Sequence, residues 1–139
     1  MEGAGIHFSG RVTRGQGRGR TLGFPTANLL PHCDKPLPQG VFAAKVQCPG
    51  SGILSAVAHI GPRPTFAEAA LVIELHILDF TGDLYGQTLQ VALVKKLRDQ
   101  RAFACPDELV GQIRKDINQA RALFASKSEG GKRGVKYGG

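Results

Sequence analysis

The sequence contains no tryptophan, only three cysteines and no apolar run long enough to cross a membrane. A helix that spans a bilayer needs about 20 predominantly apolar residues. The cysteines lie far apart and form no Cys-x-x-Cys pair, so neither a structural zinc site nor a disulfide framework is indicated. The N-terminus lacks a basic segment followed by an apolar one, which argues against a secretory signal. These absences favour a cytoplasmic protein with reduced thiols.

Acidic residues are also few, because 18 Lys and Arg stand against 11 Asp and Glu for a net charge of +7. The excess is concentrated in a Gly- and Lys-rich tail over 127–139 and in a group of four arginines within residues 11–20. Such segments suit a nucleic-acid surface or a small polyphosphate, or they are simply solvated. The seven Phe and two Tyr never alternate with basic residues, as a stacking platform for nucleic acid requires. A small nucleic-acid-binding β-barrel therefore stays an alternative that rests on charge alone.

Short stretches of alternating apolar residues, separated by Gly and Pro, fill the first hundred positions. The pattern predicts several antiparallel strands in a sheet or closed barrel. It is clearest in the segment LVIELHILDF, residues 71–80, and recurs in 8–12, 40–48, 53–61 and 88–97. With 139 residues, the chain has the length of one domain with its own core.

The last third of the chain changes to a helical period. Pro106 suits the first position of a helix, and acidic residues follow it where the helix dipole favours them. One apolar stripe is formed by Leu109, Ile113, Ile117, Ala120 and Phe124. We expect a linker over 1–7, a domain over 8–126 closed by this helix, and a disordered tail over 127–139.

Three features could carry chemistry, and each also has a purely structural explanation. The glycine- and arginine-rich segment 14–23 could bring backbone N–H groups close to a phosphate, although a mobile surface loop explains it equally well. In LGFPTANLL, residues 22–30, a rigid turn would present the oxygens of Thr26 and Asn28 to Mg²⁺, or these side chains would cap the turn. Glu74 lies within an apolar strand, where it is either solvated, paired with His76 or a general base.

The order of these motifs along the chain resembles that of the riboflavin kinases. The matching blocks are GRVTRGQGRGRTLGFPTANL, GVFAA, HIGPRPTF, IELHILDFTGDLYG and LR, followed by a helix with ELVGQIRKDINQAR. The similarity extends from about Phe8 to Phe124 and is to the kinase module of bacterial bifunctional FAD synthetases. It implies a mainly β fold, a six-stranded antiparallel Greek-key barrel with a C-terminal α-helix.

The resemblance also implies a reaction, in which the γ-phosphoryl group of ATP is transferred to the 5′-hydroxyl of riboflavin to give FMN and ADP. It assigns Glu74 as the general base and Thr26 and Asn28 as ligands of Mg²⁺ or another divalent ion that binds with ATP. Arg98 and Phe103 would contact the flavin. The nucleotide-binding residues would be Gly15, Gly17, Gly19, Arg20, Gly23, Pro25 and Thr26.

Some positions depart from the usual pattern of the family. His59 and Phe42 stand where asparagine and tyrosine are common, and Gln16 and Gly17 replace the commoner Asp pairing in the glycine-rich loop. No HxGH-type motif occurs, so we expect this chain to make FMN without FAD. We expect a monomer with ATP and riboflavin as partners and with neither membrane nor nucleic acid bound. The main alternative is a flavin-binding module without catalytic activity.

Overall fold

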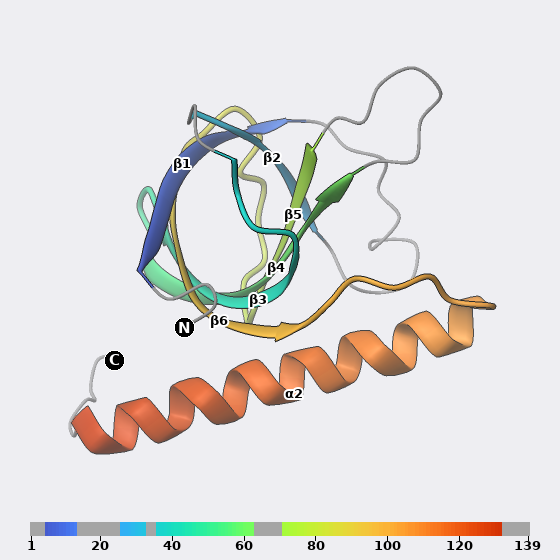
Figure 1. The fold of residues 1–139 in the computed structure, drawn as a ribbon. Helices are drawn as coiled ribbons and strands as arrows, with labels where there is room; N and C mark the ends of the chain where they lie inside the picture. Colours follow the sequence, from blue (N-terminus) through green and yellow to red (C-terminus); the bar gives the residue numbers. More distant parts are fainter. Residues whose placement is uncertain (1–4, 14–25, 33–35, 63–70, 132–139) are drawn as a thin grey trace.

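The structure, a computed structural model, describes residues 5–13, 26–32, 36–62 and 71–131. Six strands and one helix make up this part of the chain (Figure 1). The strands are β1 (Ile6–Thr13), β2 (Ala27–Pro31), β3 (Gly40–Cys48), β4 (Gly52–Pro62), β5 (Leu71–Ile77) and β6 (Thr88–Arg98), and the helix is α2 (Pro106–Gly131).

The strands close into one antiparallel barrel in the order β1-β2-β5-β4-β3-β6. β1 closes it by pairing with β2 on one side and with β6 on the other. The pairs β2–β5 and β3–β6 join strands that are not consecutive in the chain, as in a Greek key. The predicted six-stranded antiparallel barrel with a C-terminal helix is therefore confirmed.

Alternation along each strand places one set of side chains inside the barrel and the other set outside. The interior is filled by aromatic and branched side chains, with Phe42, Ile73, Leu75 and Leu89 completely buried. β1 and β2 approach so closely that a Cβ at Gly10 would lie 2.7 Å from the Leu30 carbonyl oxygen. Only glycine fits at that contact, which explains why the apolar alternation of β1 is interrupted there.

The sequence predicted a rigid turn that contains Thr26 and Asn28. For Asn28 this prediction is wrong, because the residue lies within β2. There Asn28 pairs with Thr13 of β1 and with Glu74 of β5. Thr26 comes directly before the strand. The proline that motivated the prediction precedes β2, and Pro31 ends it, so neither removes a hydrogen bond from the centre of the ladder.

α2 packs lengthwise against the outer surface of the barrel, over β4, β3 and β6 (Figure 1). Ala120 and Phe124 of the predicted apolar stripe are buried in a second core against Val41, Ala43 and Val57. The helix begins at Pro106 as predicted and continues to Gly131, beyond the expected boundary at Ser126. At the other end of the chain, β1 begins at Ile6, two residues before the expected start of the domain.

Candidate active site

Four polar residues of interest lie with Val41 on the outer face of the barrel, in one row that crosses five strands. Asn28 of β2 pairs with Glu74 of β5, which pairs with His59 of β4. His59 in turn pairs with Val41 of β3, and Val41 with Arg98 of β6. We call these five residues the cross-strand row. The neighbours of Glu74 and Asn28 along their strands point into the core, so alternation places both polar side chains outside.

Asn28, a predicted metal ligand, and Glu74, the predicted general base, are direct neighbours across β2 and β5. Side chains opposite one another in an antiparallel pair have Cβ atoms about 5 Å apart. Together with Thr26, two residues before Asn28, they offer hydroxyl, amide and carboxylate oxygens within one small area. The hydroxyl and amide oxygens suit Mg²⁺, which takes only one or two protein oxygens and leaves its other positions to phosphates and water, and the carboxylate stays beside them. Within the described ranges, no three His, Cys, Asp or Glu side chains gather to hold a metal.

His59 is partly exposed but closely surrounded by protein. Burial lowers the pKa of its imidazole from 6.5 to about 4, with the positive charge of Arg98 and His76 acting in the same direction and Asp116 opposing them. His59 is therefore neutral at neutral pH and adds no positive charge beside Glu74. The pKa shift also shows that Asp116 and Arg98 lie close enough to His59 to act on its charge. His59 is the direct neighbour of Glu74.

The shifted pKa of His59 predicts that the protein loses stability in mild acid. In the unfolded chain the imidazole takes up a proton near pH 6.5, whereas in the folded chain it does so only near pH 4. The free energy of unfolding should be unaffected by this group above pH 7 and should fall by about 3 kcal/mol as the pH drops from 6.5 to 4. Urea unfolding at a series of pH values measures this loss.

Two substitutions serve as comparisons in that experiment. His59→Asn removes the titrating group and should flatten the pH dependence between 6.5 and 4. His7→Asn removes an exposed histidine of β1 and should leave the dependence unchanged. Equal slopes for wild type and His59→Asn would show that the folded protein protonates His59 normally.

Arg98, one of the two predicted flavin contacts, is held by an ion pair that the sequence analysis did not anticipate. Its Nε and Nη2 atoms each donate to one carboxylate oxygen of Asp116, both at 2.9 Å. Asp116, which lies on α2, is completely buried. The sequence does carry a signal for it, because Asp116 is three residues after Ile113 and four before Ala120, on the apolar stripe of the helix.

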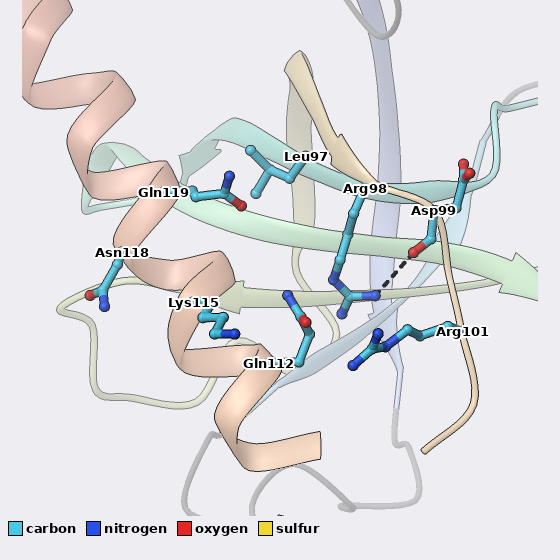
Figure 2. Close-up of a pocket in the computed structure, with 8 residues that line it drawn as sticks. All are labelled: Leu97, Arg98, Asp99, Arg101, Gln112, Lys115, Asn118 and Gln119. Atoms are coloured by element: carbon cyan, nitrogen blue, oxygen red, sulfur yellow. Dashed lines mark hydrogen bonds between the residues drawn. The ribbon is translucent and has the colours of Figure 1, made fainter. Parts of the chain in front are cut away.

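A cavity of about 630 Å³ opens beside Arg98 of this ion pair. This size lies within the range of small-molecule sites, which is about 300–1,000 Å³. Its lining side chains are drawn in Figure 2. Figure 2 shows the side chains of Arg98, Arg101 and Gln112 converging between α2 and the segment after β6. The full lining is Leu97, Arg98, Asp99, Arg101, Gln112, Lys115, Asn118 and Gln119.

The cavity is electrostatically positive and rich in hydrogen-bond donors. Arg101 and Lys115 carry charges for which no ion pair is found among the described residues, while Asp99 is paired with Lys96 at 2.6 Å. Phe103, the second predicted flavin contact, lies nearby with its ring centroid 4.7 Å from the guanidinium of Arg101 and 5.8 Å from that of Arg98. Arg98 and Phe103 are thus brought together, at the opposite end of the cross-strand row from Asn28.

The predicted nucleotide-binding residues fall outside the described part of the chain, with one exception. Thr26 is described, but Gly15, Gly17, Gly19, Arg20, Gly23 and Pro25 are not. Their assignment to ATP stays a prediction.

Comparison with known proteins decides the family. The family model described as Flavokinase, riboflavin kinase, matches residues 2–124, which is most of the chain. The chain belongs to the riboflavin kinase family. The described residues contain no helix with the length and hydropathy that a bilayer crossing requires.

Curated relatives of this riboflavin kinase family member include bifunctional riboflavin kinase/FMN adenylyltransferases. The protein of Escherichia coli strain K12 is 46% identical over 117 residues, and that of Haemophilus influenzae is 40% identical over 117 residues. Both alignments cover 84% of this chain but only 37% and 38% of the relatives. The chain therefore spans little more than a third of the length of these relatives.

Solved structures show the same fold. A Streptococcus pneumoniae structure described as a macrolide-efflux protein superposes with a TM-score of 0.78 at 34% identity, covering 84% of this chain and 38% of that one. Riboflavin kinase from Trypanosoma brucei superposes with a TM-score of 0.58 at 24% identity, covering 86% of this chain and 79% of that one. At this low identity, the second match supports the fold alone.

Proposed function

We propose that this chain is a riboflavin kinase, which transfers the γ-phosphoryl group of ATP to the 5′-hydroxyl of riboflavin and yields FMN and ADP. The observation that carries the proposal is the direct pairing of Asn28 with Glu74 across β2 and β5 in a member of this family. A phosphoryl transfer needs a group that orients the acceptor hydroxyl and groups that neutralise the charge of the phosphates. On the outer face of the barrel, Glu74 would orient the hydroxyl, and Asn28 beside it would hold the metal ion that neutralises the phosphates.

Glu74 is the general base in this proposal. Its carboxylate accepts the proton of the 5′-hydroxyl while the oxygen attacks the γ-phosphorus, and the bond to the β-phosphate oxygen of ADP breaks. The imidazole of His59, the direct neighbour of Glu74 on β4, is neutral at neutral pH and adds no positive charge at this site.

Thr26 and Asn28 would hold Mg²⁺ together with the phosphates of ATP. When bound, the ion supplies positive charge for the transferring phosphoryl group. Because Asn28 lies on a strand that is paired on both sides, its backbone is fixed relative to Glu74. This fixed spacing would hold the base and the ion in a constant arrangement. The nucleotide itself would be held by Gly15, Gly17, Gly19, Arg20, Gly23, Pro25 and Thr26.

Riboflavin would place its ring in the cavity beside Arg98 and Phe103 and its 5′-hydroxyl toward Glu74. Neighbouring strands lie about 4.8 Å apart, so Glu74 and Arg98, three strands apart, are separated by about 14 Å along the curved surface. The ribityl chain would cover part of this interval, and the reach of the Glu74 and Arg98 side chains the rest. The aromatic face of Phe103 and the donors of Arg101 and Gln112 suit a planar ring with carbonyl groups.

A single incubation tests the proposed function. The purified protein is mixed with riboflavin, ATP and Mg²⁺, and the flavins are separated by chromatography. We expect FMN without FAD, and no FMN when EDTA removes the divalent ion. Bound riboflavin without turnover would instead identify a flavin-binding module, and FAD would reveal an adenylyltransferase activity. Salt-sensitive binding of an oligonucleotide, with no flavin bound, would favour the nucleic-acid-binding alternative.

We also infer that the protein acts as a monomer in the cytoplasm. Cys48 and Cys105 are both free thiols, which is the state that a reducing compartment maintains. Sedimentation of the purified protein, with and without substrates, measures the oligomeric state directly.

A further inference from the structure

Among the described residues, Asp116 is the one polar or charged residue that is completely buried. It lies on the side of α2 that faces the barrel, one turn before Ala120 of the second core. A carboxylate in such a position is costly unless its charge and its lone pairs are satisfied by partners. Its partners therefore indicate what it does.

Both oxygens of Asp116 are engaged, and they hold groups that line the cavity. Oδ1 accepts from Arg98 Nε at 2.9 Å and from Gln112 Nε2 at 3.0 Å, and Oδ2 accepts from Arg98 Nη2 at 2.9 Å. Arg98 Nη1 donates to the carbonyl oxygen of Asp99 at 3.0 Å (Figure 2). The guanidinium of Arg98 is thereby fixed in one orientation with its side chain only 16% exposed.

This arrangement leaves part of the guanidinium available to a ligand. An arginine side chain has five N–H donors. Three of those of Arg98 are engaged by described residues, and one on each Nη atom has no partner among them. The carboxylate behind Arg98 thus fixes how its remaining donors are presented at the wall of the cavity.

Stability alone is a weak reason for such a pair. Replacing a buried ion pair with apolar residues of similar volume is often neutral or stabilising, because desolvation offsets the attraction of the charges. Building on the riboflavin site proposed above, we propose that Asp116 is a positioning residue for the flavin. It holds Arg98 and Gln112 in the orientation in which they bind the ring, and it does not contact the substrate itself.

Asp116→Asn tests the proposal by replacing one acceptor with a donor and removing the charge that holds Arg98. We expect the KM for riboflavin to rise about tenfold, as expected for the loss of an oriented charged hydrogen bond. The KM for ATP and kcat should change less than about twofold. The matched control is Asp79→Asn, which breaks an exposed two-bond pair between the same helix and the barrel, formed with Arg121 at 2.8 and 2.9 Å. It should leave the KM for riboflavin unchanged.

The double variant Arg98→Met with Asp116→Leu separates positioning from folding. It should keep a cooperative unfolding transition near that of wild type, yet bind riboflavin about tenfold more weakly, as measured by quenching of flavin fluorescence without ATP. Wild-type riboflavin affinity in the double variant, or an unchanged KM for riboflavin in Asp116→Asn, would overturn the positioning role of Asp116. The proposed function would not be affected by either result. Absence of riboflavin binding by the wild-type protein would overturn both the positioning role and the proposed function.

Discussion

Glu74→Gln is expected to lower kcat for riboflavin phosphorylation by about 10²–10⁴-fold, the usual contribution of a general base. Glutamine keeps the size of the side chain and a carbonyl oxygen, but it cannot accept the proton of the 5′-hydroxyl. The strand pairing of Glu74 with Asn28 and His59 uses backbone groups and should persist. FMN formation at saturating ATP and riboflavin measures the loss, and equilibrium binding of an ATP analogue should stay near wild type.

Glu108→Gln is the matched control for this substitution. Glu108 lies in the first turn of α2, where its carboxylate accepts a hydrogen bond from the Ala104 backbone N–H at 3.2 Å, and a glutamine oxygen can replace it. The variant should turn over at nearly the wild-type rate. If Glu74→Gln retained more than about a tenth of the wild-type kcat, the proton would have another acceptor and Glu74 would only orient the hydroxyl.

Phe42→Ala is expected to lower the free energy of unfolding by about 3–5 kcal/mol. Phe42 is completely buried inside the barrel, where six strands surround it and relaxation into a cavity is limited. A domain of this kind has a total stability of roughly 5–15 kcal/mol, so the variant could lose much of its folded population. Urea unfolding monitored by circular dichroism measures the change.

Two further variants serve as controls for Phe42→Ala. Phe42→Leu keeps most of the volume and should cost less than about 1.5 kcal/mol. Phe103→Ala removes a partly exposed phenylalanine that lies outside the barrel against Arg101, and it should change stability by less than about 1 kcal/mol. Similar losses for Phe42→Ala and Phe103→Ala would mean that the barrel interior is not the main source of stability.

The strands that follow alternation were predictable because a period of two is a local property of the chain. Leu71–Ile77 and Thr88–Arg98 both occur where apolar residues alternate. β2 was not predictable in the same way, since Ala27–Pro31 has five residues and lies among prolines. It is a strand because β1 and β5 pair with it on both sides. That is a tertiary effect, which local propensity does not report.

The candidate site shows the same division between local and tertiary information. Residue types and motif order together indicated Asn28 and Glu74, but their adjacency depends on the pairing of two strands that are far apart in the sequence. Asp116 was missed because a single acid within a helix usually faces solvent. Its burial depends on where α2 crosses β6, which brings Arg98 under it.

Closure of the barrel also constrains how this chain folds during synthesis. Ile6 and Phe8 of the first strand pair with Leu93 and Val91 of the last, so the ring cannot close until all six strands have left the ribosome. At synthesis rates of roughly 5–20 residues per second, the first strand waits several seconds for its partner. During that time its inward-facing apolar residues are exposed, and chaperones that hold extended apolar segments can act on the nascent chain at this stage.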